Sequence, residues 1–258
     1  MKQKEIKLIA NQSIEKLLNA KKNINYFEEP FKHVVIDNFF PEKFAYKLYD
    51  SFPDLNLAEW DSTNDKDIEI KHRSKWKSEF DIPDEILPAV RIFNSSLFLN
   101  AMSKIIGIKK LIPDPYFTGG GLNVTEADGL LDVHVDGNYH DSSGLNRRIN
   151  AILYLNPGWV EGWGGEFGLY NDGGDNLVKK VAPIFNRLVI FDTHDKSYHG
   201  LPDPLNFPDG KNRKSIILYY YTKESRDNSQ ITVDSPHSAL WRKRGLKDKR
   251  GNETRDFT

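Results

Sequence analysis

Residues 119–222 contain a series of short extended runs, and this pattern most restricts what the chain can fold into. Glycine, proline, asparagine and aspartate separate the runs, and no segment of helical periodicity lies between them. The runs are LNVTEA, LLDVHVD, RRINAILYLN, GEFGLYN, KVAPIF, RLVIFD and RKSIILYYYT. Many short strands joined by turns are typical of an antiparallel sandwich or a jelly-roll barrel. The second half of the chain is therefore predicted to be a β-barrel.

Three segments of the first half place apolar side chains at helical spacing. Residues 5–20 fit one amphipathic helix. Pro41 suits the first turn of a second helix, and an apolar stripe then recurs every four residues at Phe44, Leu48 and Phe52. Residues 84–106 predict two helices, or one helix that kinks at Pro88 because proline removes a backbone donor.

The remaining parts of the first half are a strand and an unassigned stretch. A strand is expected within residues 31–40, whose centre is β-branched, whereas residues 54–80 are polar and mixed. The chain thus predicts an α+β fold with a mainly β core: a jelly roll, or double-stranded β-helix, with N-terminal supporting helices on one face. We expect a single domain with a helical support region (about 1–110), a jelly-roll core (about 111–224) and a C-terminal extension (about 225–258).

Composition excludes several classes of protein. The chain of 258 residues has 36 basic and 37 acidic side chains, so no general attraction to nucleic acid or acidic membranes is expected. It has no cysteine, which excludes disulfides, thiolate metal sites and cysteine nucleophiles. No signal peptide is recognisable, and no apolar run approaches the roughly 18 residues that span a bilayer. We expect a soluble, cytoplasmic protein, and the sequence leaves its oligomeric state open.

The end of the chain, residues 241–256, is basic. Such a run could bind phosphates or an acidic partner, but it is more often a solvated and partly disordered tail. We expect the tail to be solvated and assign it no function.

The stretch from Asp132 to Gly137 carries a metal-binding pattern. Side chains alternate along a strand, so His134 and Asp136 point to the same face as Asp132. A histidine and a carboxylate two residues apart can occupy neighbouring positions on one metal ion. They bind it tightly only with a third ligand, and Asp132 itself receives no role.

His199, after the apolar strand RLVIFD, is the best third ligand. Early and late strands are neighbours in a jelly roll, so this residue can complete the site. Two histidines and one carboxylate leave metal positions open, which suits ferrous iron better than a closed structural zinc site. His140 and His194 are the competitors, and we expect surface or supporting positions for them, with His140 exposed.

Arg213 and Ser215 open the last strong strand and share one of its faces. If they point inward, the buried guanidinium needs an anion, and its planar fork matches a carboxylate. An open metal beside such an arginine predicts a pocket for a dicarboxylate that chelates the metal at one end. 2-Oxoglutarate fits this description.

The motifs HVD, AILYLN, GGEF, NRLVIFD, SYHG and RKSIILYYY occur in this order within about residues 116–222. Together they resemble the iron(II)- and 2-oxoglutarate-dependent dioxygenases, in particular the prolyl 4-hydroxylase-like branch. The resemblance implies that His134, Asp136 and His199 bind the iron.

The resemblance also implies a co-substrate pocket. Arg213 matches the residue that pairs with the distal carboxylate of 2-oxoglutarate, and Tyr154 resembles a tyrosine that assists it. Asn150 alternates onto the same strand face as Tyr154, and Ser215 adds a hydroxyl donor beside Arg213. The loop before Arg213 is longer than in many members of the family. Lys211 and Lys214 are therefore weaker alternatives to Arg213 as the residue that pairs with the distal carboxylate.

The reaction implied is decarboxylation of 2-oxoglutarate to succinate with O2, coupled to hydroxylation of a substrate C–H bond; ascorbate is an optional reductant. No side chain is expected to act as a catalytic base. A prolyl residue of a peptide or protein is the first choice of substrate. The alternatives are a free amino acid, a sugar or another small metabolite, or a catalytically inactive metal-binding barrel. Residues that could line the mouth of the pocket are Tyr139, Arg147, Arg148 and Trp163.

Overall fold

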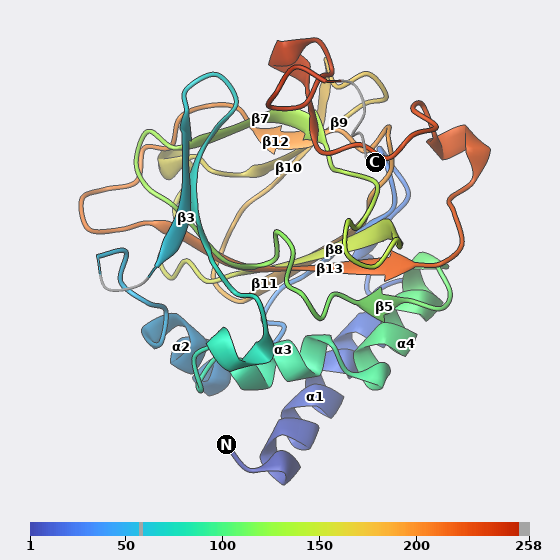
Figure 1. Ribbon diagram of the computed structural model, residues 1–258. Coiled ribbons are helices and arrows are strands. Elements are labelled where there is room, and N and C mark those ends of the chain that lie inside the picture. The colour runs from blue at the N-terminus through green and yellow to red at the C-terminus, as the bar shows by residue number, and fades with distance from the viewer. Residues whose placement is uncertain (57–58, 253–258) are drawn as a thin grey trace.

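All strand pairs in the computed structural model, which describes residues 1–56 and 59–252, are antiparallel. The strands are β1 (Tyr26–Phe27), β2 (His33–Ile36), β3 (Trp60–Asp65), β4 (Glu69–Ser74), β5 (Ile112–Pro113), β6 (Gly121–Thr125), β7 (Leu130–Val135), β8 (Asn146–Tyr154), β9 (Phe167–Tyr170), β10 (Leu177–Val181), β11 (Arg187–Asp192), β12 (His199–Leu201), β13 (Arg213–Thr222) and β14 (Leu240–Trp241). Their main order is β1-β2-β11-β8-β13-β6-β4-β7-β12-β9-β10. Figure 1 shows this sheet folding over, so that β7, β12, β9 and β10 lie above β11, β8 and β13. The predicted jelly roll is confirmed.

The helices cover the lower face of the lower layer (Figure 1). They are α1 (Gln3–Leu18), α2 (Glu42–Asp50), α3 (Leu87–Phe93) and α4 (Ser96–Ile106), with short 3-10 turns η1 (Glu79–Asp81), η2 (Glu161–Trp163), η3 (Asn228–Gln230) and η4 (Arg242–Arg244). The segment around Pro88 forms two helices rather than one kinked helix, because Pro88 lies in the first turn of α3 and Ser95 caps α4. None of the helices in the described ranges is long and apolar enough to cross a membrane.

Alternation along the lower strands divides the core in two. On β8, Leu153 packs with the helices, whereas Ile152 and Tyr154 point to the other face. On β11, Phe191 joins Tyr154 in the inner cluster, which also includes Phe167 of the upper layer. Each fully buried apolar side chain stabilises the fold by about 1.5–3 kcal/mol. The inner face is where the predicted site residues lie.

The segment that the sequence left unassigned forms the hairpin β3–β4. Strand β4 pairs with β6 through His72↔Val124 and with β7 through Ile70↔Leu130, so it joins the two layers along one side. Its sequence, EIKHRS, has none of the apolar alternation that identifies a strand. Pairing with two barrel strands, rather than local preference, makes this segment extended.

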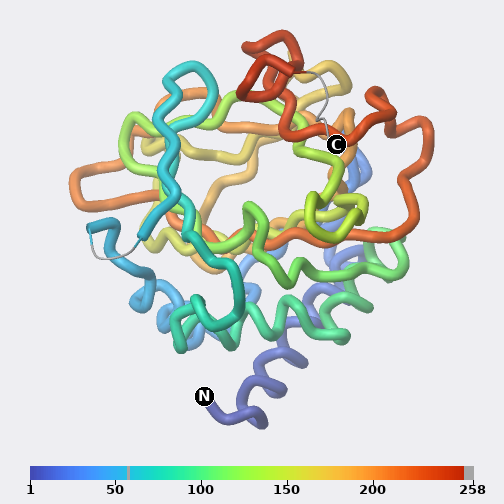
Figure 2. Tube along the Cα trace, in the orientation of Figure 1, coloured from blue at the N-terminus to red at the C-terminus, as the bar shows by residue number. Residues whose placement is uncertain are grey.

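Residues 241–252 of the basic C-terminal segment are ordered by turns and ion pairs rather than partly disordered, although most of them are exposed to solvent as expected. Figure 2 follows the segment across the barrel on the side opposite the helices. Arg244 forms an ion pair with Asp65 at 2.6 Å, and Lys249 pairs with Glu69, so the basic side chains bind the hairpin β3–β4. The remainder of the predicted tail, residues 253–256, lies outside the described residues.

The same segment assigns a role to Asp132, for which the sequence suggested none. Its Oδ2 atom accepts a hydrogen bond at 2.9 Å from the backbone N–H of Lys243, in the first turn of η4. A carboxylate at this position satisfies a donor that a helical turn leaves free. Asp132 therefore anchors the C-terminal segment to β7.

Candidate active site

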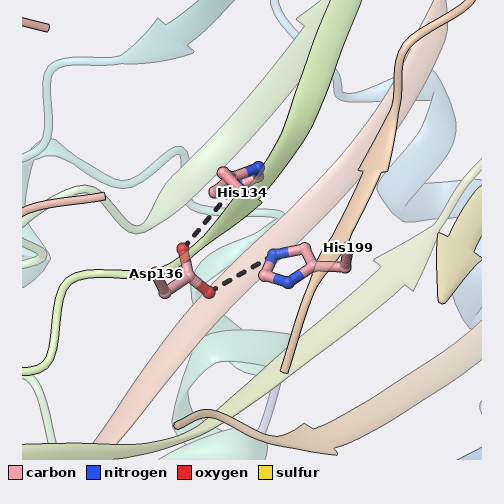
Figure 3. A group of neighbouring side chains, drawn as sticks. All are labelled: His134, Asp136 and His199. Atoms are coloured by element: carbon pink, nitrogen blue, oxygen red, sulfur yellow. Dashed lines mark ion pairs between the residues drawn. The ribbon is translucent and has the colours of Figure 1, made fainter. Parts of the chain in front are cut away.

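His134, Asp136 and His199 converge between the two layers (Figure 3). His134 on β7 lies directly opposite His199 on β12, and Asp136 follows the end of β7. The Nε2 atoms of His134 and His199 lie 3.7 Å and 3.4 Å from the two oxygens of Asp136. One ligand atom from each residue lies within 4.8 Å of the others, so the three can hold one metal ion.

Both imidazoles are held with Nε2 toward the centre of this group. Nδ1 of His134 lies 2.9 Å from the carbonyl of Asp132, and Nδ1 of His199 lies 2.8 Å from the carbonyl of Ser197. A carbonyl oxygen only accepts, so each Nδ1 carries the hydrogen and each Nε2 offers its lone pair. Burial lowers the pKa of His199 to about 4, so this imidazole is neutral and ready to bind metal at neutral pH.

The Asp136 carboxylate is ionised and oriented by its neighbours. Burial alone would raise the pKa of Asp136, but the nearby Arg147 guanidinium holds it well below its usual range. Oδ2 accepts a hydrogen bond from Nδ2 of Asn150 at 2.7 Å and lies 3.3 Å from Nη2 of Arg147. The donor set of two histidines and one carboxylate fits a divalent metal such as iron(II) with positions left open.

Aromatic rings cover both histidines. Trp241 of β14 stacks on the His134 ring with centroids 4.5 Å apart. Phe191 and Phe167 contact the His199 ring at 4.9 Å and 5.3 Å. Trp241 lies in the C-terminal segment, far from the motif along the chain, and no local pattern indicated that it would contact a metal ligand.

Arg213, at the start of β13, is a buried basic residue of the inner face. Its side chain is 6% exposed and has no carboxylate partner within the described part of the chain. Nε donates to the carbonyl of Gly165 at 2.8 Å. A Cβ on Gly165 would lie 3.0 Å from Cδ of Arg213, so glycine permits this close approach. A buried guanidinium without a counterion is costly, and an anionic ligand would offset the cost.

Two buried hydroxyls lie beside Arg213. Tyr154, whose ring centroid is 4.9 Å from the guanidinium carbon, is the register partner of Ser215. Within the described ranges, neither Oη of Tyr154 nor Oγ of Ser215 makes a hydrogen bond of normal geometry, although the Arg213 guanidinium is close enough to offset part of the rise that burial causes in the pKa of Tyr154. A buried hydroxyl left unpaired costs about 1–3 kcal/mol. A guanidinium fork and two free hydroxyl donors fit one carboxylate group of 2-oxoglutarate.

The remaining residues that the sequence proposed for the pocket or its mouth make contacts away from Arg213. Asn150 shares the inner face, but its amide contacts Asp136 rather than Arg213 or Tyr154. Lys214 lies with its ammonium group 4.8 Å from the Tyr49 ring, on the helix side of β13. Among the proposed mouth residues, Arg147 reaches the metal ligands, while Trp163 packs against Phe207 and Lys211.

The expectation that His140 is exposed is wrong. The residue is 2% exposed, and its Nε2 lies 3.0 Å from Asp114. Its Nδ1 accepts backbone N–H groups of Ser142 and Ser143. His140 thus orders the loop before β8, and His194 contacts the Phe31 ring rather than the metal ligands.

This arrangement defines a jelly roll with an open two-histidine, one-carboxylate metal site. Residues 120–221 match the family model of the 2OG-Fe(II) oxygenase superfamily. Prolyl 3-hydroxylase OGFOD1 of Xenopus laevis is 34% identical over 106 residues, which are 38% of this chain and 20% of that protein. The Mus musculus protein of the same name is 25% identical over 198 residues, 75% of this chain and 33% of the relative.

A solved structure has the same fold. It is a prolyl hydroxylase from Trichoplax adhaerens in complex with a peptide fragment of the hypoxia inducible factor oxygen degradation domain. The TM-score is 0.52 at 16% identity, and the alignment covers 86% of this chain and 94% of that chain.

Residues 120–221 thus match the 2OG-Fe(II) oxygenase superfamily model, and the chain resembles proteins named prolyl hydroxylases, as the motifs predicted. The chain spans between a fifth and a third of the length of these curated relatives.

Proposed function

We propose that the chain is an iron(II)- and 2-oxoglutarate-dependent dioxygenase that hydroxylates a prolyl residue of a peptide or protein, with O2 as the oxidant. One observation carries the proposal: the metal triad shares its inner face with a buried arginine and two hydroxyls that lack partners in the described ranges. A triad alone fits many metal proteins. A triad with a carboxylate clamp fits a co-substrate that chelates the metal and extends to the clamp.

Each side chain has a defined task in this proposal. His134 and His199 hold the metal through Nε2, and Asp136 holds it through a carboxylate oxygen. Arg213 and the hydroxyls of Tyr154 and Ser215 bind the distal carboxylate of 2-oxoglutarate. Bound iron(II) supplies the redox chemistry that couples O2 and 2-oxoglutarate decarboxylation to C–H hydroxylation. The residues of this chain bind, orient and exclude water, and none of them needs to act as a base.

Prolyl substrate specificity is supported by the relatives, which are named prolyl hydroxylases. The two curated relatives are named 3-hydroxylases, whereas the sequence motifs resemble the 4-hydroxylase-like branch. The position of hydroxylation is therefore part of the test. Ascorbate as a reductant and a cytoplasmic location stay predictions from the sequence.

We also propose that residues 1–258 work as one catalytic domain. The pairings of β2 with β11 and of β4 with β6 and β7 support this, because they join the N-terminal region to the jelly-roll core. The C-terminal extension contributes Trp241, which covers a metal ligand.

The test is mass spectrometry of proline-containing peptides, free amino acids and sugars incubated with the protein, iron(II), ascorbate and 2-oxoglutarate. The expected result is a gain of one oxygen on a peptidyl proline, with succinate formed in equal amount and no product without 2-oxoglutarate. Fragmentation and comparison with 3- and 4-hydroxyproline standards give the position. Oxygen gained only by a free amino acid or sugar would refute the prolyl assignment. Absence of 2-oxoglutarate turnover with every candidate substrate would refute the proposal that the chain is a 2-oxoglutarate-dependent enzyme.

A further inference from the structure

The carboxylate of Asp136 extends from a short gap between two backbone contacts. The ladder between β7 and β14 ends at Val135, which pairs with Leu240, and the next backbone hydrogen bond is from Asn138 N–H to the carbonyl of His237. Within this gap, the contacts of the Asp136 side chain set the orientation of the carboxylate. Its nearest donor is Asn150 of β8, at 2.7 Å.

The amide of Asn150 has its orientation set by Arg147. The Oδ1 atom of Asn150 accepts from Nε of Arg147 at 3.1 Å and from Nη2 at 2.9 Å. A guanidinium only donates, so the amide oxygen must face Arg147 and the NH2 group must face Asp136. Arg147 in turn lies over the Tyr219 ring, 3.5 Å from its centroid, and its carbonyl accepts from Arg226. Arg147, which orients the amide that reaches Asp136, is thus itself held through its side chain and its backbone.

We propose that Asn150 is a positioning residue that fixes Asp136 for metal binding through one oxygen, an inference that rests on the metal site of the proposed function. Oδ2 accepts from the Asn150 amide and lies near Arg147, and His199 Nε2 is 3.4 Å from it. Within the described residues, Oδ1 accepts no hydrogen bond and has the 3.7 Å approach of His134 Nε2. Oδ1 is therefore the oxygen left for the metal.

Single-oxygen binding matters for the number of open positions. A six-coordinate metal held by His134, His199 and one oxygen of Asp136 would keep three positions open. A chelating 2-oxo acid would take two of them and leave one. If the carboxylate rotated and bound through both oxygens, the last position would be filled. Asn150 prevents this rotation by holding Oδ2.

Asn150 gives a cleaner test than Arg147. Replacing Arg147 would also remove a buried positive charge that contacts Asp136 directly. Asn150→Leu keeps the approximate shape and removes only the hydrogen-bonding amide, and Asn150→Ser supplies a second variant whose short hydroxyl cannot span the gap. The matched control is Asn146→Leu, on the same strand, because the Asn146 amide donates to the Lys223 carbonyl away from the metal ligands.

The experiment is titration of each purified protein with Co(II), with the visible absorption spectrum as a readout of coordination number and circular dichroism as the check of folding. We expect both Asn150 variants to bind Co(II) about 10- to 100-fold more weakly than the parent. Their spectra should shift, because the carboxylate is free to bind through both oxygens. Asn146→Leu should match the parent in affinity and spectrum.

The outcomes separate this inference from the proposed function. Folded Asn150 variants with the affinity and spectrum of the parent would refute the role of Asn150 and leave the metal site standing. A parent protein that binds no Co(II) would refute the metal site and, with it, this inference. An equal effect of Asn146→Leu would show a general loss of strand order and would also refute the positioning role.

Discussion

The two ends of the inner face differ in how completely the protein satisfies its own polar groups. At the metal end, carbonyls hold both histidines, and Asn150 and Arg147 hold Asp136. At the arginine end, the guanidinium of Arg213 has no carboxylate partner, and the two hydroxyls beside it have no hydrogen-bond partner, within the described part of the chain.

The difference indicates which part of the site the chain builds alone. The candidate metal ligands are already oriented, so a metal ion would enter a site whose protein contacts are complete. The arginine end bears unpaired polar groups that cost about 1–3 kcal/mol each when buried. Such groups are tolerable when a ligand satisfies them, and the co-substrate is the component that would complete this end.

Loss of a metal ligand should have the largest effect and should act on the metal end alone. His199→Ala is expected to weaken iron(II) or Mn(II) binding by more than about 100-fold, the upper range for residues that merely support a ligand. Turnover of 2-oxoglutarate should be lost with it. Calorimetric titration and a succinate assay measure the two effects, with His72→Ala on strand β4 as the control. Undiminished turnover in folded His199→Ala would contradict the assignment.

Loss of the guanidinium should act on the arginine end alone. Arg213→Ala is expected to weaken 2-oxoglutarate binding by about 2–5 kcal/mol, roughly 30-fold to several thousand-fold, because the distal carboxylate loses its buried partner. Metal affinity should stay unchanged. Titration with 2-oxoglutarate in the presence of Mn(II) measures it, and Lys214→Ala, on the opposite face of β13, is the control. Equal 2-oxoglutarate affinity in mutant and parent would contradict the assignment of Arg213 to the co-substrate pocket.

The smallest effect is expected from the unpaired hydroxyl of Tyr154. Tyr154→Phe should weaken 2-oxoglutarate binding by about 1.5 kcal/mol, near 10-fold, since one hydrogen bond to a charged group is lost. The melting temperature without co-substrate should be unchanged or higher, because the hydroxyl has no partner there. Thermal unfolding with and without 2-oxoglutarate measures both. A lower melting temperature without co-substrate would show that this hydroxyl is satisfied within the protein.

Much of the candidate site could be predicted because side-chain alternation and short sequence motifs indicate its residues. The alternation of β7 places His134 and Asp136 together, and the family motifs indicate His199 and Arg213. The hairpin β3–β4 and the role of Trp241 could not be predicted in this way. Their sequences are polar or basic, and they become ordered through partners far away in the chain.

His140 is a similar case, because its polar surroundings suggested exposure although Asp114, distant in sequence, pairs with it in the interior.

The sequence by itself determined the jelly-roll class and the supporting helices, and it indicated the three candidate metal ligands that the fold brings together, because periodicity and motif order can be read along the chain. Only the tertiary structure decided which buried polar groups have hydrogen-bond partners within the protein and which are left for a ligand to pair. Asn150 was expected in the co-substrate pocket, yet its amide binds Asp136. Hydrogen bonding inside a barrel depends on which strands face one another, and that is a property of the folded chain.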